Sequence, residues 1–197
     1  MKILYNLLHL LFPLRENAKL LADKTPAHIR AYYAPYNTDA FTALASYKEP
    51  IIRAAIHEIK FHNNEHAAVL LGALLTEWTL HQDASCILVP IPLSSARYRS
   101  RGYNQLDRIL KHTSYTNTLP ALERIYNSTP QSSLARAERL TNLTGAFRVR
   151  RRYRKAVAGT HIVLIDDVAT TGATFAAARA ALLPYHPASI RCIAPAH

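Results

Sequence analysis

Two adjacent carboxylates followed by small, hydroxyl-bearing residues form the strongest chemical pattern in the sequence. Asp166 and Asp167 come directly after the apolar run 161–165. Neighbouring like charges repel, so such a pair suits a site where it accepts hydrogen bonds from hydroxyls or lies near a cation. The next residues are typical of a turn whose backbone N–H groups bind a phosphate at a helix start. They are Val168, Ala169, Thr170, Thr171, Gly172, Ala173 and Thr174.

Together these features describe a site for a ribose 5-phosphate, which carries two vicinal hydroxyls and one phosphate on a small frame. A nucleotide-hydrolase strand also ends in an acid, but it requires a G-x-x-x-x-G-K-[ST] loop. None of the five glycines begins such a loop. A purely structural turn is the other alternative, and it gives no reason for the acid pair.

The elements that must position these residues alternate between strands and helices. The apolar runs 86–92, 161–165 and 189–194 predict buried strands, and the alanine-rich run 175–183 predicts a helix. Strands without polar alternation are typical of a parallel sheet covered on both faces. We therefore predict an α/β fold with a mainly parallel sheet, in which the acid pair lies at the carboxyl end of a strand.

The first part of the chain is expected to be helical. Pro50 suits the first turn of a helix over 50–61, and Asn63 or Asn64 suits the cap of a second helix reaching about residue 82. We expect residues 1–83 to form a helical part that packs on an α/β domain of residues 84–197, as one compact unit. Shorter helices are expected at 1–14, 104–112 and 134–143, with a strand at 122–127.

Composition excludes several classes of protein. Apolar residues make up 49% of the 197 residues, so the chain can bury a core. Cys86 and Cys192 stand far apart in apolar runs, which excludes a disulfide framework and a four-thiolate zinc site. We expect both to be core thiols in a reducing cytoplasm. No apolar stretch approaches the roughly 18 residues of a membrane span, and a secretory signal is not expected at the start.

The net charge of +11 lies entirely in residues 84–197, which indicates an anionic ligand or partner. Six basic residues occur within 148–155. This run is interpreted as a solvated hairpin or loop edge, as a loop facing pyrophosphate, or as a patch that binds single-stranded nucleic acid. The candidate nucleic-acid residues are Arg150, Arg151, Arg152, Arg154 and Lys155.

A competing pattern joins His62, Glu65 and His66 in the H-x-x-E-H order of inverted zinc peptidases. That chemistry requires both histidines on one helix. Asn63 and Asn64 instead predict a turn or cap between them, so we do not expect a zinc hydrolase.

The segment 163–174 resembles the phosphoribosyl-pyrophosphate signature of the type I phosphoribosyltransferases, with four apolar residues, two acids and a Thr-Thr-Gly-x-Thr loop. Further motifs resemble the ComF family, the competence-associated amidophosphoribosyltransferase-like proteins. Many members carry a four-cysteine zinc module near the start, and residues 14–19 contain no cysteine there. The motifs are Leu11-Phe12-Pro13, Lys60-Phe61, Val89-Pro90-Ile91-Pro92-Leu93, Arg97, Arg101-Gly102-Tyr103-Asn104-Gln105, Glu138-Arg139, Asn142 and Gly145-Ala146-Phe147.

The resemblance implies a phosphoribosyltransferase-type sheet, phosphoribosyl pyrophosphate as substrate, Mg²⁺ as cofactor and no zinc. It implies that Asp166 and Asp167 hold the ribose hydroxyls directly or around Mg²⁺, and that 168–174 binds the 5-phosphate. Arg97 and Arg101 would face the pyrophosphate. The resemblance also implies a pyrophosphate loop of Pro90, Ile91, Pro92 and Leu93, and a flexible covering loop with Gln131, Arg139 and Asn142.

The family association implies a cytoplasmic role in the uptake of transforming DNA, with single-stranded DNA and competence-machinery proteins as partners. Two alternatives stay open. One is a salvage enzyme that joins a nucleobase or an amine to the ribose. The other is a non-catalytic module that senses the ligand or binds single-stranded DNA.

Overall fold

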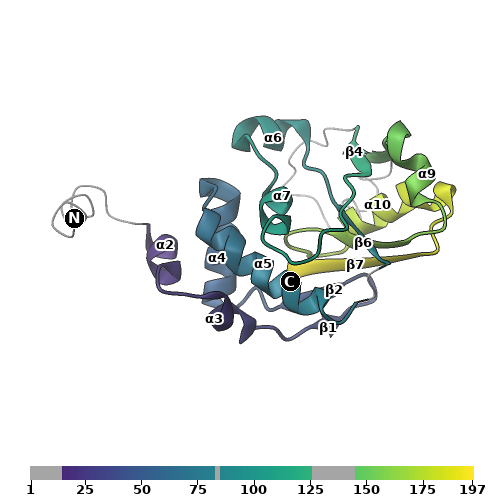
Figure 1. Cartoon of the computed structure of the whole chain (residues 1–197). Coiled ribbons are helices and arrows are strands. Elements are labelled where there is room, and N and C mark those ends of the chain that lie inside the picture. The colour runs from purple at the N-terminus through teal and green to yellow at the C-terminus, as the bar shows by residue number, and fades with distance from the viewer. Residues whose placement is uncertain (1–14, 83–84, 126–144) are drawn as a thin grey trace.

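A five-stranded sheet forms the centre of the computed structural model, which describes residues 15–82, 85–125 and 145–197 (Figure 1). The strand order is β1-β2-β7-β6-β3. Every neighbouring pair is parallel except β1 with β2, so the predicted mainly parallel α/β fold is confirmed. The strands are β1 (Tyr36–Asn37), β2 (Thr42–Ala45), β3 (Ile87–Pro90), β6 (His161–Ile165) and β7 (Ser189–Ala196).

Strand β6 is buried at four of its five positions because it lies between β3 and β7. Its last residue, Ile165, pairs with Pro90 at the end of β3. The amide of Ile91 then donates to the Ile165 carbonyl oxygen at 2.9 Å. The segments that follow β3 and β6 therefore leave the sheet side by side, at the carboxyl ends of the two strands.

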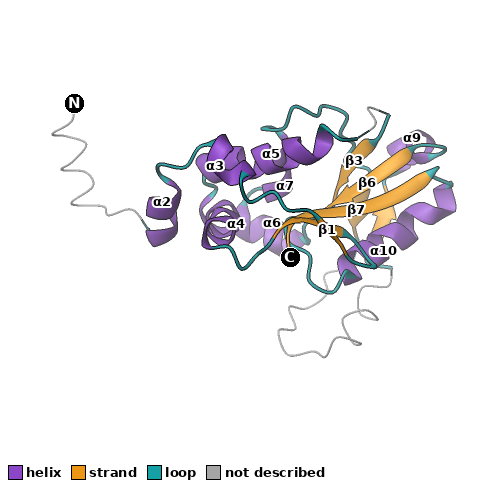
Figure 2. Cartoon of the chain, turned by 90° about the horizontal axis from the view of Figure 1, so that it is seen from below, coloured by secondary structure: helices purple, strands orange, loops and turns teal. Residues whose placement is uncertain are grey.

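Helices cover both faces of the sheet. Alternate residues of β6 point into two cores: Val163 packs with α4, α5 and α7, whereas Leu164 packs with α10. Figure 2 shows α10 along the sheet, and α3, α4 and α5 grouped together. The helices are α2 (Glu16–Leu21), α3 (Pro26–Arg30), α4 (Pro50–His62), α5 (Glu65–Thr79), α6 (Ser95–Arg101), α7 (Gln105–Leu110), α9 (Arg154–Val157) and α10 (Ala173–Leu182), with 3₁₀ turns η1 (Arg151–Tyr153) and η2 (Leu183–Tyr185).

The junction between α4 and α5 forms as the sequence predicts. Asn63 ends α4 in the left-handed region at φ 47°, and the Asn64 side chain accepts a hydrogen bond from the amide of Ala67 at 3.2 Å. His62 therefore closes one helix and His66 lies in the first turn of the next. The two histidines do not share a helix, so the inverted zinc-peptidase arrangement is absent from these described residues.

Some elements were not predicted. Strands β1 and β2 come from the part expected to be helical. The strand expected at 122–127 is present as β4 (Leu122–Arg124), which forms a separate antiparallel pair with the unpredicted β5 (Phe147–Val149). The division at residues 83 and 84 stays a prediction. The helices expected at 1–14 and 134–143 lie outside the described residues. Within the described ranges, no helix is long and apolar enough to cross a membrane.

Gly72, in the middle of α5, provides a test of this packing. An added Cβ would lie 2.8 Å from both Cβ and the carbonyl oxygen of His112, so α5 and the segment after α7 touch through backbone. Gly to Ala at an exposed helical position stabilises by about 1 kcal/mol. We expect Gly72→Ala to lower the melting temperature instead, because overpacking costs about 1–3 kcal/mol. Thermal unfolding measures this, and an unchanged or raised melting temperature would contradict the close contact.

Candidate functional site

The acid pair lies at the end of β6, and its backbone holds both carboxylates in place. The amide of Asp166 donates to the Ile193 carbonyl oxygen at 3.2 Å, which continues the pairing with β7. Asp166 Oδ1 accepts from the amide of Asp167 at 2.9 Å, and Asp167 Oδ1 accepts from the amide of Val168 at 2.7 Å. The chain therefore turns tightly at the carboxyl end of the strand, as predicted.

Asp167 is buried and already has charged and polar partners. Its Oδ2 lies 3.1 Å from Lys60 Nζ, at the end of α4, and accepts from Gln105 Nε2, at the start of α7, at 2.6 Å. Arg101 Nη1 in turn donates to Gln105 Oε1 at 2.8 Å. The carboxylate thus joins the sheet to both α4 and α7.

Asp166 differs from its neighbour. It makes no ion pair with any residue that the structure describes. Burial, and then the charge of Asp167, raise the pKa of Asp166 to about 7, although the hydrogen bond from the Asp167 amide and the charges of Lys60 and Arg97 oppose the shift. A cation or a hydroxyl donor beside Asp166 would stabilise its ionised form.

The carboxylate oxygens at the carboxyl end of β6 fit Mg²⁺, which prefers oxygen ligands and retains several waters. Asp166 supplies the available carboxylate. Asp167 is held by Lys60 and Gln105, so it would act through waters or through the ribose hydroxyls.

The loop from Val168 to Gly172 returns the chain into α10. The amide of Ala169 donates to the Ala196 carbonyl oxygen at 3.1 Å, which anchors the loop beside β7. Gly172 has φ 76°, and an added Cβ would lie 2.6 Å from the Ala40 Cβ. Within the described residues, the amides of Thr170, Thr171 and Gly172 donate to no other group. Three amides at the start of a ten-residue helix suit an anion.

The segment after β3 lies beside the acid pair. Ile91 is buried, whereas Pro92 and Leu93 are partly exposed. Ser94 caps α6 by accepting from the amide of Arg97 at 3.3 Å. Arg97 lies near enough to Asp166 for its charge to oppose the rise of the Asp166 pKa.

Arg101 is linked to the acid pair through Gln105, because it donates to Gln105 Oε1 and Gln105 donates to Asp167. The Arg101 guanidinium carbon also lies 5.5 Å from the centre of the Phe61 ring.

Three residues near the acid pair were not predicted as site residues from the sequence. They are Lys60, Gln105 and Arg124. Burial and the charge of Arg97 lower the pKa of Arg124, and Asp166 raises it, which places all three groups in one electrostatic environment. Lys60 and Gln105 appeared only among the family motifs. Arg124 had no signal, because its proximity depends on the β4–β5 pairing.

A cavity of about 420 Å³ lies beside the predicted pyrophosphate loop, and the acid pair is not part of its lining. Gln131, Arg139 and Asn142 lie outside the described residues. The lining residues are Pro92, Leu93, Ser95, Tyr98, Arg99, Asn104, Asp107, Glu123, Arg124 and Arg150.

The basic run divides into paired and exposed residues. Arg148 Nε donates to Glu123 Oε1 at 2.6 Å across the β4–β5 pair, and Arg150 Nε donates to the Leu122 carbonyl oxygen at 3.2 Å. The hairpin-edge interpretation therefore describes this beginning of the run. The other basic residues, all exposed, are Arg151, Arg152, Arg154 and Lys155.

Two glycines with similar backbone conformation test the crowding of the loop. Gly159 has φ 68° with nothing near its missing Cβ, whereas Gly172 has φ 76° and Ala40 in the way. Gly159→Ala is the control, since it adds only the left-handed strain of about 1–2 kcal/mol. We expect Gly172→Ala to lower the free energy of unfolding by a further 1 kcal/mol or more, by about the cost of overpacking. Equal losses in chemical denaturation would contradict the close approach to Ala40.

Comparisons with known proteins find relatives of the chain among curated bacterial proteins. No protein-family model matches it. The chain is 31% identical over 137 residues to the DNA utilization protein YhgH of Salmonella typhimurium, which covers 64% of this chain and 59% of that one. The protein of that name from Escherichia coli is 30% identical over 159 residues, which is 75% of this chain and 67% of that one. The competence protein ComFC of Bacillus subtilis is 34% identical over 104 residues, 53% of this chain and 41% of that one.

Among solved structures, an orotate phosphoribosyltransferase of Mycobacterium tuberculosis, in complex with Fe(III) dicitrate, aligns with a TM-score of 0.39 and 11% identity over 92% of this chain and 96% of that one. That likeness is too low to support an inference. The chain spans about three fifths of the length of the Salmonella relative and two thirds of the Escherichia one. On the sequence identities, the chain belongs to the family of the DNA utilization protein YhgH.

Proposed function

We propose that the chain binds phosphoribosyl pyrophosphate with Mg²⁺ where β3 and β6 end, and transfers the phosphoribosyl group. The observation that best supports this is the carboxylate pair followed by a loop with three available amides at the start of α10. A ribose 5-phosphate carries vicinal hydroxyls and a phosphate on one small frame, which matches this pair of features. Arg97 supplies positive charge beside the pair, where the pyrophosphate would lie.

The residues divide the chemistry of the transfer. The loop 168–174 holds the 5-phosphate, and Asp166 and Asp167 hold the ribose hydroxyls directly or around Mg²⁺. The bond from C1 of the ribose to pyrophosphate breaks, and a bond to the acceptor nucleophile forms at C1. Arg97 and Arg101 stabilise the negative charge that develops on the departing pyrophosphate. When bound, Mg²⁺ supplies further charge stabilisation for the same leaving group.

Lys60 acts one step away from the reaction. Its Nζ lies 3.1 Å from Asp167 Oδ2, so its positive charge is placed beside the acid pair. A carboxylate accepts hydrogen bonds from hydroxyls, so Asp167 suits a sugar as ligand.

The relatives' names suggest the process that this chemistry serves. They are called DNA utilization and competence proteins, and we propose that this chain acts in the use or uptake of DNA. The acceptor distinguishes this role from nucleotide salvage. Pyrophosphate release in the presence of nucleobases and simple amines would favour salvage, and release only with a DNA-derived acceptor would favour DNA utilisation.

Substitution of the acid pair tests the proposed ligand site. Asp166→Asn should remove most of the thermal stabilisation by phosphoribosyl pyrophosphate with Mg²⁺, and Asp166→Ala with Asp167→Ala should abolish it. Hydrogen bonds to charged groups contribute about 1.5–3 kcal/mol each. Differential scanning fluorimetry with and without ligand measures the shift, and leaving out Mg²⁺ should reduce it.

Asp23→Asn provides the matched control, because Asp23 is an exposed acid paired only with Lys24 in the turn after α2. Its ligand-induced shift should equal that of the parent. An unchanged shift in the double variant would refute the assignment of the acid pair.

A second function is supported by the four exposed basic residues of the run, together with the relatives' names. We propose that Arg151, Arg152, Arg154 and Lys155 contact the phosphates of single-stranded DNA. The Arg152 guanidinium lies 4.6 Å from the centre of the Tyr153 ring, and an aromatic ring beside a cation suits base stacking.

Salt dependence tests this surface. Changing those four residues to glutamine should reduce the log–log salt slope of single-strand binding by up to about 2.8, since each phosphate contact contributes about 0.7. Fluorescence anisotropy over a salt series measures the slope. A control variant removes four exposed charges elsewhere, and it should keep the parent slope. If both variants change the slope equally, the basic run is not the binding surface. The control residues are Lys19, Lys48, Arg53 and Lys111.

A further inference from the structure

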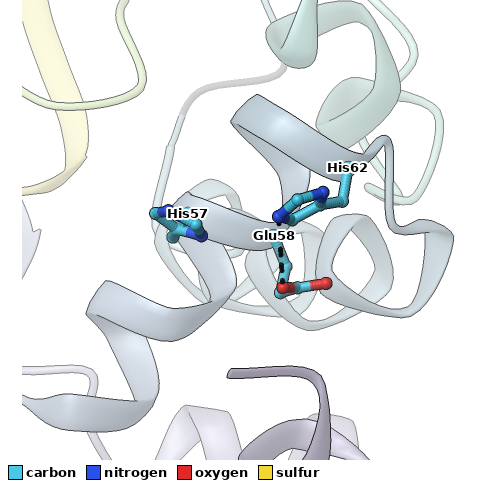
Figure 3. A group of neighbouring side chains, drawn as sticks. All are labelled: His57, Glu58 and His62. Carbon is cyan, nitrogen blue, oxygen red and sulfur yellow. Dashed lines mark ion pairs between the residues drawn. The ribbon is translucent and has the colours of Figure 1, made fainter. Parts of the chain in front are cut away.

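Three side chains able to bind a metal gather at the last turns of α4, away from the acid pair. His57, Glu58 and His62 each offer a ligand atom, and these atoms all lie within 4.8 Å of one another (Figure 3). We propose that they bind one divalent ion of the first transition series, and that zinc is the best match. The proposal is independent of the phosphoribosyl site.

Glu58 retains an acceptor position for such an ion. Its side chain is fully buried, and a carboxylate accepts at about four positions. Oε2 accepts from Arg15 Nη2 at 2.8 Å and from Asn64 Nδ2 at 3.1 Å. Among the residues that the structure describes, Oε1 accepts only from Arg15 Nε, at 3.2 Å, and it lies 3.9 Å from His62 Nε2. The remaining position on Oε1 allows an ion to bind while Arg15 stays paired.

His57 has a partner that can orient its ring. Asn17 Nδ2 lies 3.1 Å from His57 Nδ1. Turning the carboxamide over places its oxygen at the same point, where it accepts from Nδ1–H and leaves Nε2 to bind the metal. Metal-binding histidines generally have such a partner on the second ring nitrogen.

The ligand types select the ion. Two imidazoles and one carboxylate match three-ligand zinc sites, in which water takes the fourth position, whereas Mg²⁺ prefers oxygen alone. Bonds of about 2.0–2.2 Å bring neighbouring ligand atoms to about 3.4 Å. Side-chain rotations that shorten these separations by up to about 1.4 Å complete the site.

The ligands of the bound ion, all on α4, would also be held by contacts from the α2 segment. Arg15 and Asn17 belong to the start of α2, and both contact the cluster on α4. The expectation of no zinc rested on the missing thiolates and on the pattern from His62 to His66, and it did not consider His57 with Glu58. That expectation and this proposal are decided by the same experiment.

The experiment titrates the untagged, chelator-treated full chain with Zn²⁺ alone, by calorimetry and by competition with a chromophoric chelator. We expect one ion per chain, a raised melting temperature, and retention of zinc in excess Mg²⁺. His57→Gln with His62→Gln should weaken binding by at least 100-fold, and Asn17→Ala by about 10–100-fold through loss of orientation. Glu58 is left intact because it anchors Arg15.

The control variant, His81→Gln with His161→Gln, removes two exposed histidines elsewhere and should bind zinc like the parent. The proposal is overturned if the parent binds no stoichiometric zinc, or if the variant without His57 and His62 still binds it as tightly. Neither readout involves phosphoribosyl pyrophosphate, so failure here leaves the proposed function unaffected.

Discussion

The contact between Asp167 and Lys60 is the interaction on which the arrangement of the site depends. The two side chains are 8% and 21% exposed, so the pair forms largely out of water. A buried pair adds little net stability, but loss of one partner leaves an uncompensated charge. The pair therefore fixes where α4 ends relative to β6. Gln105 adds a third element by donating to the same Asp167 oxygen.

The structure of the sheet explains why charged groups can gather at the carboxyl end of β6. Both faces of β6 are covered, so its apolar run stabilises the fold while its carboxyl end carries the polar residues. Burial then acts differently on the two acids. Lys60 compensates Asp167, whereas the pKa of Asp166 rises to about 7. A site that holds one acid with a raised pKa is suited to a ligand that brings a cation or hydroxyl donors.

Local sequence signals predicted the core of this arrangement. The run before Asp166 gave a buried strand, Pro50 and Asn64 marked helix starts, and the Asp-Asp-loop pattern placed the acids at a strand end. These features depend on neighbours within a few residues.

Long-range pairings could not be predicted in the same way. Lys60 and Asp167 are separated by 107 positions, and no periodicity relates them. Strand β2 is short and forms because β7 provides its hydrogen-bonding partner. The His57 cluster was missed because Asn17 and Arg15, which orient it, come from another helix.

Helix α4 connects the two polar clusters of the molecule. Glu58 pairs with Arg15 of the α2 segment, and Lys60, two residues later, pairs with Asp167. Tyr103 holds the helix end between them, because its hydroxyl donates to the Ile59 carbonyl oxygen at 2.6 Å and accepts from the Asn63 amide at 2.9 Å. A shift of α4 driven from the α2 side would therefore move Lys60 relative to the acid pair. The helical part is thus a structural support of the candidate site, since it positions a charge that the sheet cannot supply.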